Sequence, residues 1–300
     1  MDDWISSVIE HDGLVLRDRA LREGIDPDQI MKALRTGRLK RVQRCVYVHG
    51  RQEISPLALA RAAVLAIGVP DAVASHQTAA RVHGLPTPSG AGPEHVTVPR
   101  DQRRVRRKEL WCHGRPLGLG EVQVLGGVAL TSPVRTLVDL VGTVPRGDAV
   151  WAIDDGLRRG VVTRADLLAA ADARRGGEGT GRIRLRIAEA DGVSESALET
   201  AGRLALLDGS VPLPVAQFEV FDDAGPVARL DAAYPELGLG IEYDGKTVHS
   251  TPRAVFHDRK RQNRLLQSGW RLLRFTWWDV VHDTDGFVRA VRGALRERGG

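Results

Sequence analysis

Cysteine is scarce in this chain of 300 residues, because Cys45 and Cys112 are its two thiols and they lie far apart in sequence. No C-x-x-C pair occurs, which argues against a structural zinc site of the usual cysteine-rich kind. Two isolated thiols fit a reducing compartment. The longest apolar run, LALARAAVLAIGV, contains Arg61 and is too short to cross a bilayer. The start, MDDWISSVIE, is acidic and has no signal-peptide pattern. We therefore expect a cytoplasmic protein with no membrane partner.

Acidic residues are nearly missing from three stretches that are rich in arginine and lysine. The segment 31–51 has no acid, and the segments 100–108 and 253–274 have one aspartate each. The formal net charge of the chain is +5. Clustered charge of one sign is typical of a surface that binds a polyanion such as DNA. A solvated basic surface is the alternative.

Residues 1–53 have the order of a winged helix-turn-helix domain. A short helix over HDGLVLRDRALREG is followed by a second helix, for which Asp26 can be the N-cap, Pro27 the first residue and Gln29 the partner in a capping box. Alternating valines after Gly37 then indicate a strand pair. In such a domain the second helix enters the major groove and the wing contacts phosphates. The predicted DNA-binding residues are Lys32, Arg35, Arg38, Arg41 and Arg44. A small helical module that binds a protein is the alternative.

Residues 54–191 form the second predicted domain, of mixed α+β type. Helices are expected over SPLALARAAVLAIG, SHQTAARVHGL and TRADLLAAADA, and strands over EHVTVPR and GGVALT. His76, His83 and His113 do not have the spacing of metal ligands, so we expect no metal here. The residues of this domain predict no chemical function.

Residues 192–300 are expected to fold in the order α-β-β-β-α-β-α, and they carry the acidic residues of interest. The third strand, LGLGIEYDG, ends with Glu242 and Asp244 on one face, with Gly238 and Gly240 leaving space beside them. If the PELG turn centres between Glu236 and Leu237, Asp231 of the preceding strand lies opposite Glu242. Crowded carboxylates need a cation or a raised pKa. Hard oxygen ligands suit Mg²⁺ or Mn²⁺, so Asp231, Glu242 and Asp244 are the predicted metal ligands.

This segment, RLDAAYPELGLGIEYDGKTVHS…DRKRQNRLLQSGWRLLRFT, resembles the PD-(D/E)XK nuclease superfamily and, within it, a bacterial family related to the very-short-patch-repair (Vsr) endonucleases. The resemblance implies a restriction-endonuclease-like fold and a metal-dependent DNA endonuclease. It adds Glu199, in SALET, as the helix glutamate of the active site, although Glu199 could also close a capping box with Ser196. The superfamily's catalytic lysine is replaced by Asp244. Lys246 or His249 would then activate water, and the basic helix that carries Arg261 would bind nucleic acid.

The first half of the chain resembles the AbiEi family of type IV toxin–antitoxin antitoxins, on the segments GLVLRDRALREGIDPDQIMKALRTGRLKRVQRCVYV, SHQTAARVHGL and LTSPVRTLVDL. That resemblance implies a winged helix, a regulator and a cognate toxin as partner. The expected fold is thus a multidomain α+β or α/β protein, with a winged helix, a middle α+β domain and a C-terminal nuclease-like domain. Two functions stay open: a DNA endonuclease, or a repressor whose nuclease-like domain does not cut.

Overall fold

The chain folds into two compact units of mixed α+β structure. The first comprises residues 1–144 and 162–184, and the second comprises residues 145–161 and 185–300. The predicted division into three domains stays a prediction. A computed structural model describes residues 4–10, 12–88, 90, 92–99, 106–174, 179–245 and 252–299, with backbone alone over 252–258. Within these ranges every helix is too short or too polar to cross a membrane.

The N-terminal part of the first unit has a small sheet with the strand order β1-β3-β2. Asp26 and Gln29 form the expected capping box at the start of α3, and Val46 begins a strand as predicted. One prediction is wrong: residues 14–16 lie in a strand, not in the first helix, because Leu14 and Val15 pair with β3 and are fully buried. The elements are α1 (Trp4–Val8), β1 (Leu14–Leu16), α2 (Arg17–Arg22), α3 (Pro27–Arg35), β2 (Leu39–Gln43) and β3 (Val46–His49).

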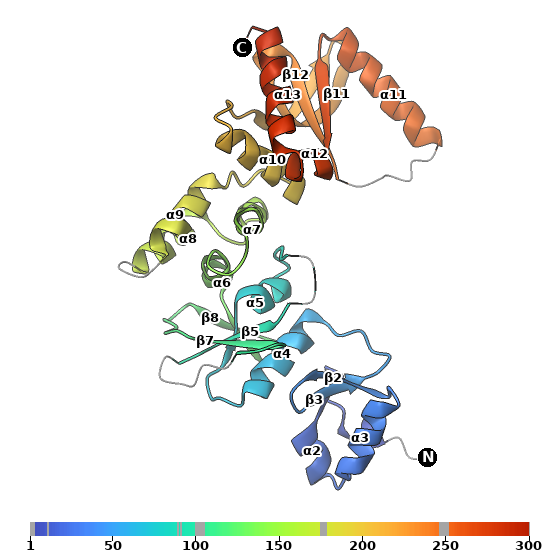
Figure 1. Ribbon diagram of the computed structural model, residues 1–300, viewed down its shortest axis with the longest axis vertical. Helices are drawn as coiled ribbons and strands as arrows, with labels where there is room; N and C mark the ends of the chain where they lie inside the picture. The colour runs from blue at the N-terminus through green and yellow to red at the C-terminus, as the bar shows by residue number, and fades with distance from the viewer. Residues whose placement is uncertain are drawn as a thin grey trace. The chain divides into compact units, whose positions relative to one another are not determined.

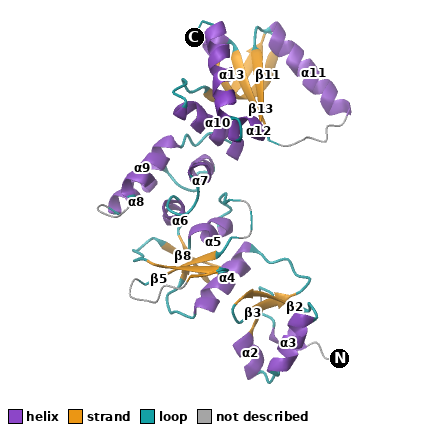
Figure 2. Cartoon of the chain, in the orientation of Figure 1, coloured by secondary structure: helices purple, strands orange, loops and turns teal. Residues whose placement is uncertain are grey.

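The remainder of the first unit is built on a sheet with the order β6-β7-β5-β4-β9-β8. Val96 and Val98 of β5 pack with Leu110 and Cys112 of β7 in an apolar cluster that includes residues of α4. The elements are α4 (Pro56–Ile67), β4 (Val73–Ala74), α5 (His76–Val82), β5 (Glu94–Val98), β6 (Arg106–Arg107), β7 (Leu110–Gly114), β8 (Val122–Leu125), β9 (Val128–Thr131), α6 (Pro133–Leu140) and α8 (Arg164–Ala173). Figure 2 shows these strands with helices around them.

The second unit has a sheet with the order β10-β11-β12-β13, in which only the last pairing, of β12 with β13, is parallel. The predicted order of helices and strands is present, with the short helix α12 added. The elements are α7 (Arg146–Arg158), α9 (Thr180–Glu189, which begins in the first unit), α10 (Ala197–Asp208), β10 (Val215–Asp222), β11 (Gly225–Tyr234), a 3-10 turn (Pro235–Leu237), β12 (Leu239–Asp244), α11 (Pro252–Gln267), β13 (Arg271–Thr276), α12 (Trp277–Val281) and α13 (Thr284–Glu297).

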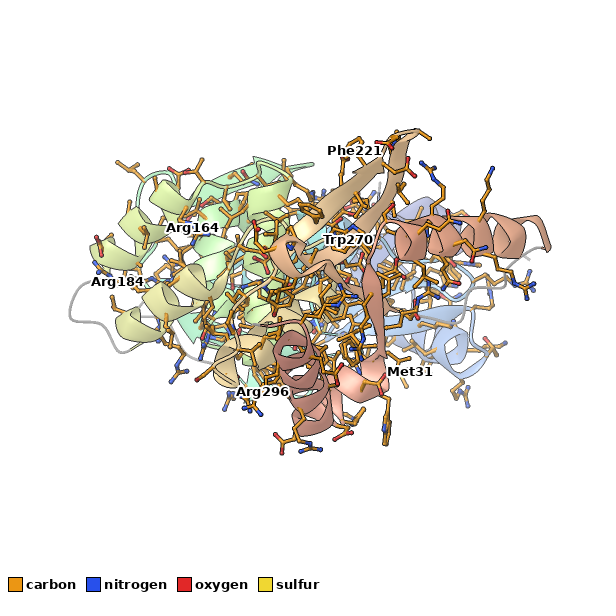
Figure 3. The ribbon with its side chains drawn as sticks, turned by 90° about the horizontal axis from the view of Figure 1, so that it is seen from above. Met31, Arg164, Arg184, Phe221, Trp270 and Arg296 are labelled. Atoms are coloured by element: carbon orange, nitrogen blue, oxygen red, sulfur yellow. The ribbon has the colours of Figure 1, made fainter. Side chains whose placement is uncertain are left out.

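Helices cover both faces of this sheet. Residues of α10, α12 and α13 pack with Leu239 and Ile241 of β12 on one face, whereas Leu265 of α11 packs with Leu230 on the other. In Figure 1, α11 and α13 flank the strands on opposite sides. Trp270 packs against this second cluster, and Figure 3 labels it together with Phe221, at the far end of β10. Trp277 and Trp278 of α12, in contrast, are exposed.

Asp154 of α7 fastens this helix to α10 within the second unit. Its carboxylate is completely buried and accepts hydrogen bonds from Thr200 Oγ1 at 2.8 Å and from the Arg203 guanidinium at 2.6 Å. The backbone N–H groups of Asp191 and Gly192 also donate to it, at 2.7 and 3.0 Å. A buried carboxylate with this many donors organises the chain around it, since each donor would otherwise be desolvated without a partner.

We predict that Asp154→Ala lowers the free energy of unfolding by about 3 kcal/mol, because it leaves several buried donors without an acceptor, even though Arg203 keeps its ion pair with Asp191 at 2.9 Å. Urea unfolding of the full chain, followed by circular dichroism, measures this change. Glu297→Ala is the control: it removes an exposed ion pair with Arg271 and is expected to cost less than about 1 kcal/mol. Equal losses for the two variants would contradict the role of Asp154.

Candidate functional site

Asp231 and Glu242 come together where the pairing of β11 with β12 ends. The register pairs Tyr234 with Leu239 and Ala232 with Ile241, so the turn centres between residues 236 and 237 as predicted. The next pair in this register is Asp231 with Glu242. Instead of a backbone carbonyl, the Asp231 carboxylate accepts the Tyr243 N–H, at 2.7 Å. The Asp231 side chain thus replaces a backbone hydrogen bond at the position where the pairing of β11 with β12 ends.

Side chains along β11 are expected to alternate between the two faces of the sheet, and this alternation is broken at Asp231. Leu230 packs in the cluster that includes Leu265 of α11, whereas Ala232 packs in the cluster on the α10 face. Opposite this position Gln217 of β10 has a left-handed backbone, with φ of +51°, and the recorded pairing of β10 with β11 skips it. Asp231 therefore lies at a change of face. Gly240 does not leave open space, because a Cβ there would meet Leu230 and Leu272 at 2.7 Å.

Burial of Asp231 raises the pKa of its carboxyl to about 6, and repulsion from Glu199 and Glu242 adds to the rise. The hydrogen bond from Tyr243 N–H and the charge of Arg229 oppose this shift and do not cancel it. Arg229 itself pairs with Glu195, at 2.8 Å. The Asp231 carboxylate is consequently the member of the group whose negative charge lacks compensation.

Glu242 is compensated by arginine. Its Oε1 lies 2.8 Å from Arg261 of α11, and its Oε2 lies 3.0 Å from Arg274 of β13. The Glu242 side chain is about nine-tenths buried, so these charge-assisted contacts replace the water it loses. Arg261, which was predicted to bind nucleic acid, thus forms an ion pair with a predicted metal ligand.

Glu199 approaches from the first turn of α10 and is 9% exposed. Ser196 Oγ accepts the Glu199 N–H at 3.2 Å, which is half of the capping box considered above. The Glu199 carboxylate does not complete the capping box. It accepts hydrogen bonds from the Glu195 N–H at 2.9 Å and from the Gln217 side-chain amide at 2.8 Å. Among the described residues, no donor reaches the buried Oε1 of Gln217. A buried acceptor oxygen therefore lies unused beside a carboxylate.

Of the other predicted site residues, Asp244 lies in the described part of the chain and is not brought into this group. Asp244 is exposed at the end of β12, opposite Thr276. Lys246 and His249 lie outside the described residues, so the choice between them stays a prediction. The described residues bring no three carboxylates within metal-ligand distance of one another; the one cluster of that kind is His76, His95 and His113. The expectation of no metal in the middle segment stays a prediction, but the spacing on which it rests missed this cluster, because the three rings come from three elements.

The predicted DNA-binding residues lie on α3 and on the β2–β3 hairpin. Lys32 and Arg35 are exposed on α3, while the buried Ile30 and Ala33 face the small core. Arg41 and Arg44 are exposed on the hairpin, and Arg38, which begins it, is half-buried. Met31 on α3 is also exposed, and its side chain is labelled in Figure 3. The basic side chains thus surround a face of α3 that the core leaves open.

Comparison with known proteins gives relatives of uncharacterized function. No family model matches the sequence. Two Mycobacterium tuberculosis proteins, uncharacterized protein MT2308 (strain CDC 1551 / Oshkosh) and uncharacterized protein Rv2248 (strain ATCC 25618 / H37Rv), are each 30% identical over 159 residues, which is 53% of this chain. The match spans 59% of the length of each relative. The crystal structure of RV2827C protein from M. tuberculosis is similar at a TM-score of 0.41 and 14% identity, over 74% of this chain and 89% of that chain.

We predict that Asp231→Asn stabilises the folded protein at neutral pH. Because the pKa of Asp231 is higher in the folded protein than in the unfolded chain, protonation of its carboxyl stabilises the folded state. This stabilisation is complete below about pH 4 and is lost as the pH rises through about 6. Asparagine keeps an acceptor for Tyr243 N–H and carries no charge. The gain should be small at pH 4 and reach at most about 3 kcal/mol at pH 8.

Urea unfolding of the wild type and the variant across this pH range, in metal-free buffer, measures the gain. Asp223→Asn, at an exposed position in the β10–β11 turn, is the matched control and should show no such growth with pH. A pH-independent difference for Asp231→Asn would contradict the assignment of an uncompensated charge.

Proposed function

We propose that the chain binds DNA through its N-terminal helix and hairpin, and that its C-terminal unit is a restriction-endonuclease-like domain that hydrolyses phosphodiester bonds with Mg²⁺ or Mn²⁺. The observation that carries the proposal is that Glu199 and Glu242, from α10 and β12, lie close enough to Asp231 of β11 for their charges to act on it, although the three carboxylates are not within ligand distance of a single ion. Their mutual repulsion contributes to the raised pKa of Asp231. Carboxylates gathered from separate elements without full compensation are typical of a metal-dependent active site.

The residues present fit a hard divalent cation. Asp231 carries uncompensated negative charge, Glu199 faces it, and Gln217 Oε1 is a buried acceptor without a donor among the described residues. Asp231 and Glu199 would hold the ion, which when bound would polarise a phosphate and lower the pKa of water. Glu242, which was predicted as a ligand, can join them by giving up one of its arginine contacts. Asp244 is too exposed to be grouped with them here.

A specific observation favours the second candidate, a DNA-binding repressor whose nuclease-like domain does not cut. Arg261 and Arg274 occupy both oxygens of Glu242, and Asp244 stands where the superfamily has lysine. An arginine-neutralised glutamate needs no metal. The antitoxin-like first half, with a cognate toxin as partner, belongs to this alternative.

DNA binding is supported by the arrangement of basic side chains around α3. Lys32 and Arg35 are on the exposed side of a helix whose other side is buried, so they can approach base edges together. Arg41 and Arg44 are on the neighbouring hairpin, where contacts with phosphates would fix the position of the helix.

We predict that the full chain nicks or cuts plasmid DNA with Mg²⁺ or Mn²⁺, and that EDTA stops the reaction. Asp231→Ala and Glu199→Gln should lower the rate by about a hundredfold or more, because each removes charge that would hold the ion. Asp223→Asn should cut at the wild-type rate. Absence of cleavage of any DNA form by the wild type, with DNA binding retained, would favour the repressor.

We predict that the Lys32→Ala/Arg35→Ala variant loses sequence preference in DNA binding, with a loss of about 1–3 kcal/mol for each base contact. Fluorescence anisotropy on a selected target and on random duplex, at several salt concentrations, measures both affinities. Arg289→Ala/Arg296→Ala removes the same charge from exposed positions of α13 and is the control. Equal effects of the two double variants on specific binding would contradict the role of α3.

A further inference from the structure

Three histidines that are distant in sequence meet on one face of the large sheet of the first unit. His95 lies on β5 and His113 on β7, and the parallel register that pairs Thr97 with His113 puts both rings on the same face. His76 begins α5, and Ser75 lies between the end of β4 and this helix. The Ser75 N–H donates to the His95 carbonyl oxygen at 3.0 Å. Backbone pairing among β4, β5 and β7 therefore brings the three rings together.

The nitrogen atoms of these rings are close enough to share one ion. His95 Nδ1 lies 3.0 Å from His113 Nε2, and one ring nitrogen from each histidine lies within 4.8 Å of the others. The rings of His76 and His113 stack with centroids 3.9 Å apart. Zn–N bonds of about 2.0–2.1 Å put two nitrogens of a tetrahedral site roughly 3.4 Å apart. A small rotation would bring His95 and His113 to this spacing, whereas the stacked rings of His76 and His113 would have to move apart.

The surroundings hold these rings in the form that metals bind. Burial lowers the pKa of all three, that of His95 to about 3, so the imidazoles are neutral. His76 Nδ1 is hydrogen-bonded to Ser75 Oγ at 2.9 Å, and Thr97 Oγ1 donates to the same oxygen at 2.8 Å. Such a chain orients one ring nitrogen and leaves the other for a ligand.

Part of the nearby positive charge is balanced by carboxylates, although the charges of Arg106 and Arg115 also act on His95 and His113. Arg135 and Arg174 both pair with Asp139, at 2.9 and 2.6 Å, and Arg135 also pairs with Glu121 at 2.7 Å. Arg81 pairs with Glu94. The field that would repel a cation from the histidines is reduced accordingly, and the Asp139 charge attracts positive charge toward His113.

The backbone of His76 is unusual, with φ of +50° at the first residue of a helix. A non-glycine residue in this region costs on the order of 1 kcal/mol, and such strain is concentrated at functional sites. A hydrogen bond between His95 and His113 alone explains neither this strain nor the stacking of a third buried imidazole. The strained backbone instead brings a third imidazole to the pair, as a site for a shared ion would require.

We propose that His76, His95 and His113 form a binding site for Zn²⁺ or a similar transition-metal ion. Among the described residues no fourth side chain joins the cluster, so one tetrahedral position is left for water or a small ligand, as in open zinc sites. A pocket of about 320 Å³, lined by His95, Trp111, Gln77 and Thr143 among others, lies beside the cluster and is a route to that position. The site lies in the first unit and does not depend on the proposed nuclease.

Metal binding by the untagged full chain tests this proposal. We expect about one equivalent of Zn²⁺ per chain by mass spectrometry of the metal, and visible absorption bands of a low-coordinate site on titration with Co²⁺. His95→Gln and His113→Gln should each weaken binding by about a hundredfold or more. His83→Gln is the control, because His83, at the end of α5, donates its Nε2–H to the Thr131 carbonyl oxygen at 2.8 Å instead. This variant should bind metal as the wild type does.

Failure of the folded wild type to bind either ion at micromolar concentration would overturn the proposal, as would unchanged binding in both histidine variants. If the variants do not fold, X-ray absorption of the zinc-loaded wild type decides. Three imidazole nitrogens at about 2.0–2.1 Å are expected, and any other number of imidazoles contradicts the site.

Discussion

Negative charge crowded at the end of the β11–β12 ladder is the constraint on which the second unit depends. Glu199, Asp231 and Glu242 come from three elements, are largely shielded from water, and lie close enough for their charges to interact. Glu242 is neutralised by Arg261 and Arg274, which draw α11 and β13 to the same point. Among the described residues, Asp231 accepts one backbone N–H and has no ion-pair partner, and the charge of Arg229 offsets only part of its own. The negative charge of Asp231 is therefore neutralised by a proton or by a bound cation. This lack of compensation is the physical basis for the proposed chemistry.

Much of this arrangement could be predicted from the sequence because it rests on local rules. The period of two along LGLGIEYDG and the length of the PELG turn predict the register, and the structure has that register. The Asp26 and Thr163 caps follow from residue type and spacing in the same way. Each of these predictions needs only neighbours within a few positions along the chain.

The rest depends on packing that no short stretch of sequence encodes. The change of face at Asp231 requires the left-handed Gln217 on another strand. The guanidinium partners of Glu242 lie 19 and 32 positions later in the chain and compete with a metal for its oxygens. The histidine cluster joins residues from α5, β5 and β7, so sequence spacing could not predict it: His76, His83 and His113 lack the spacing of ligands, and the fold adds His95.

The two units thus offer different chemistry. The carboxylates of the second unit are hard oxygen donors suited to Mg²⁺ or Mn²⁺, whereas the imidazoles of the first suit Zn²⁺. The two kinds of ligand can be distinguished by which ion each prefers, and neither proposal depends on the other.

The central claim is that Asp231 carries charge that the protein itself does not compensate. Titration of the Asp231 carboxyl by ¹³C NMR, in the full chain with and without Mg²⁺, tests it most directly. Without the ion the midpoint should lie near pH 6, and saturating Mg²⁺ should move it down by at least about one pH unit. A midpoint near pH 4 without the ion, unchanged when Mg²⁺ is added, would contradict the account.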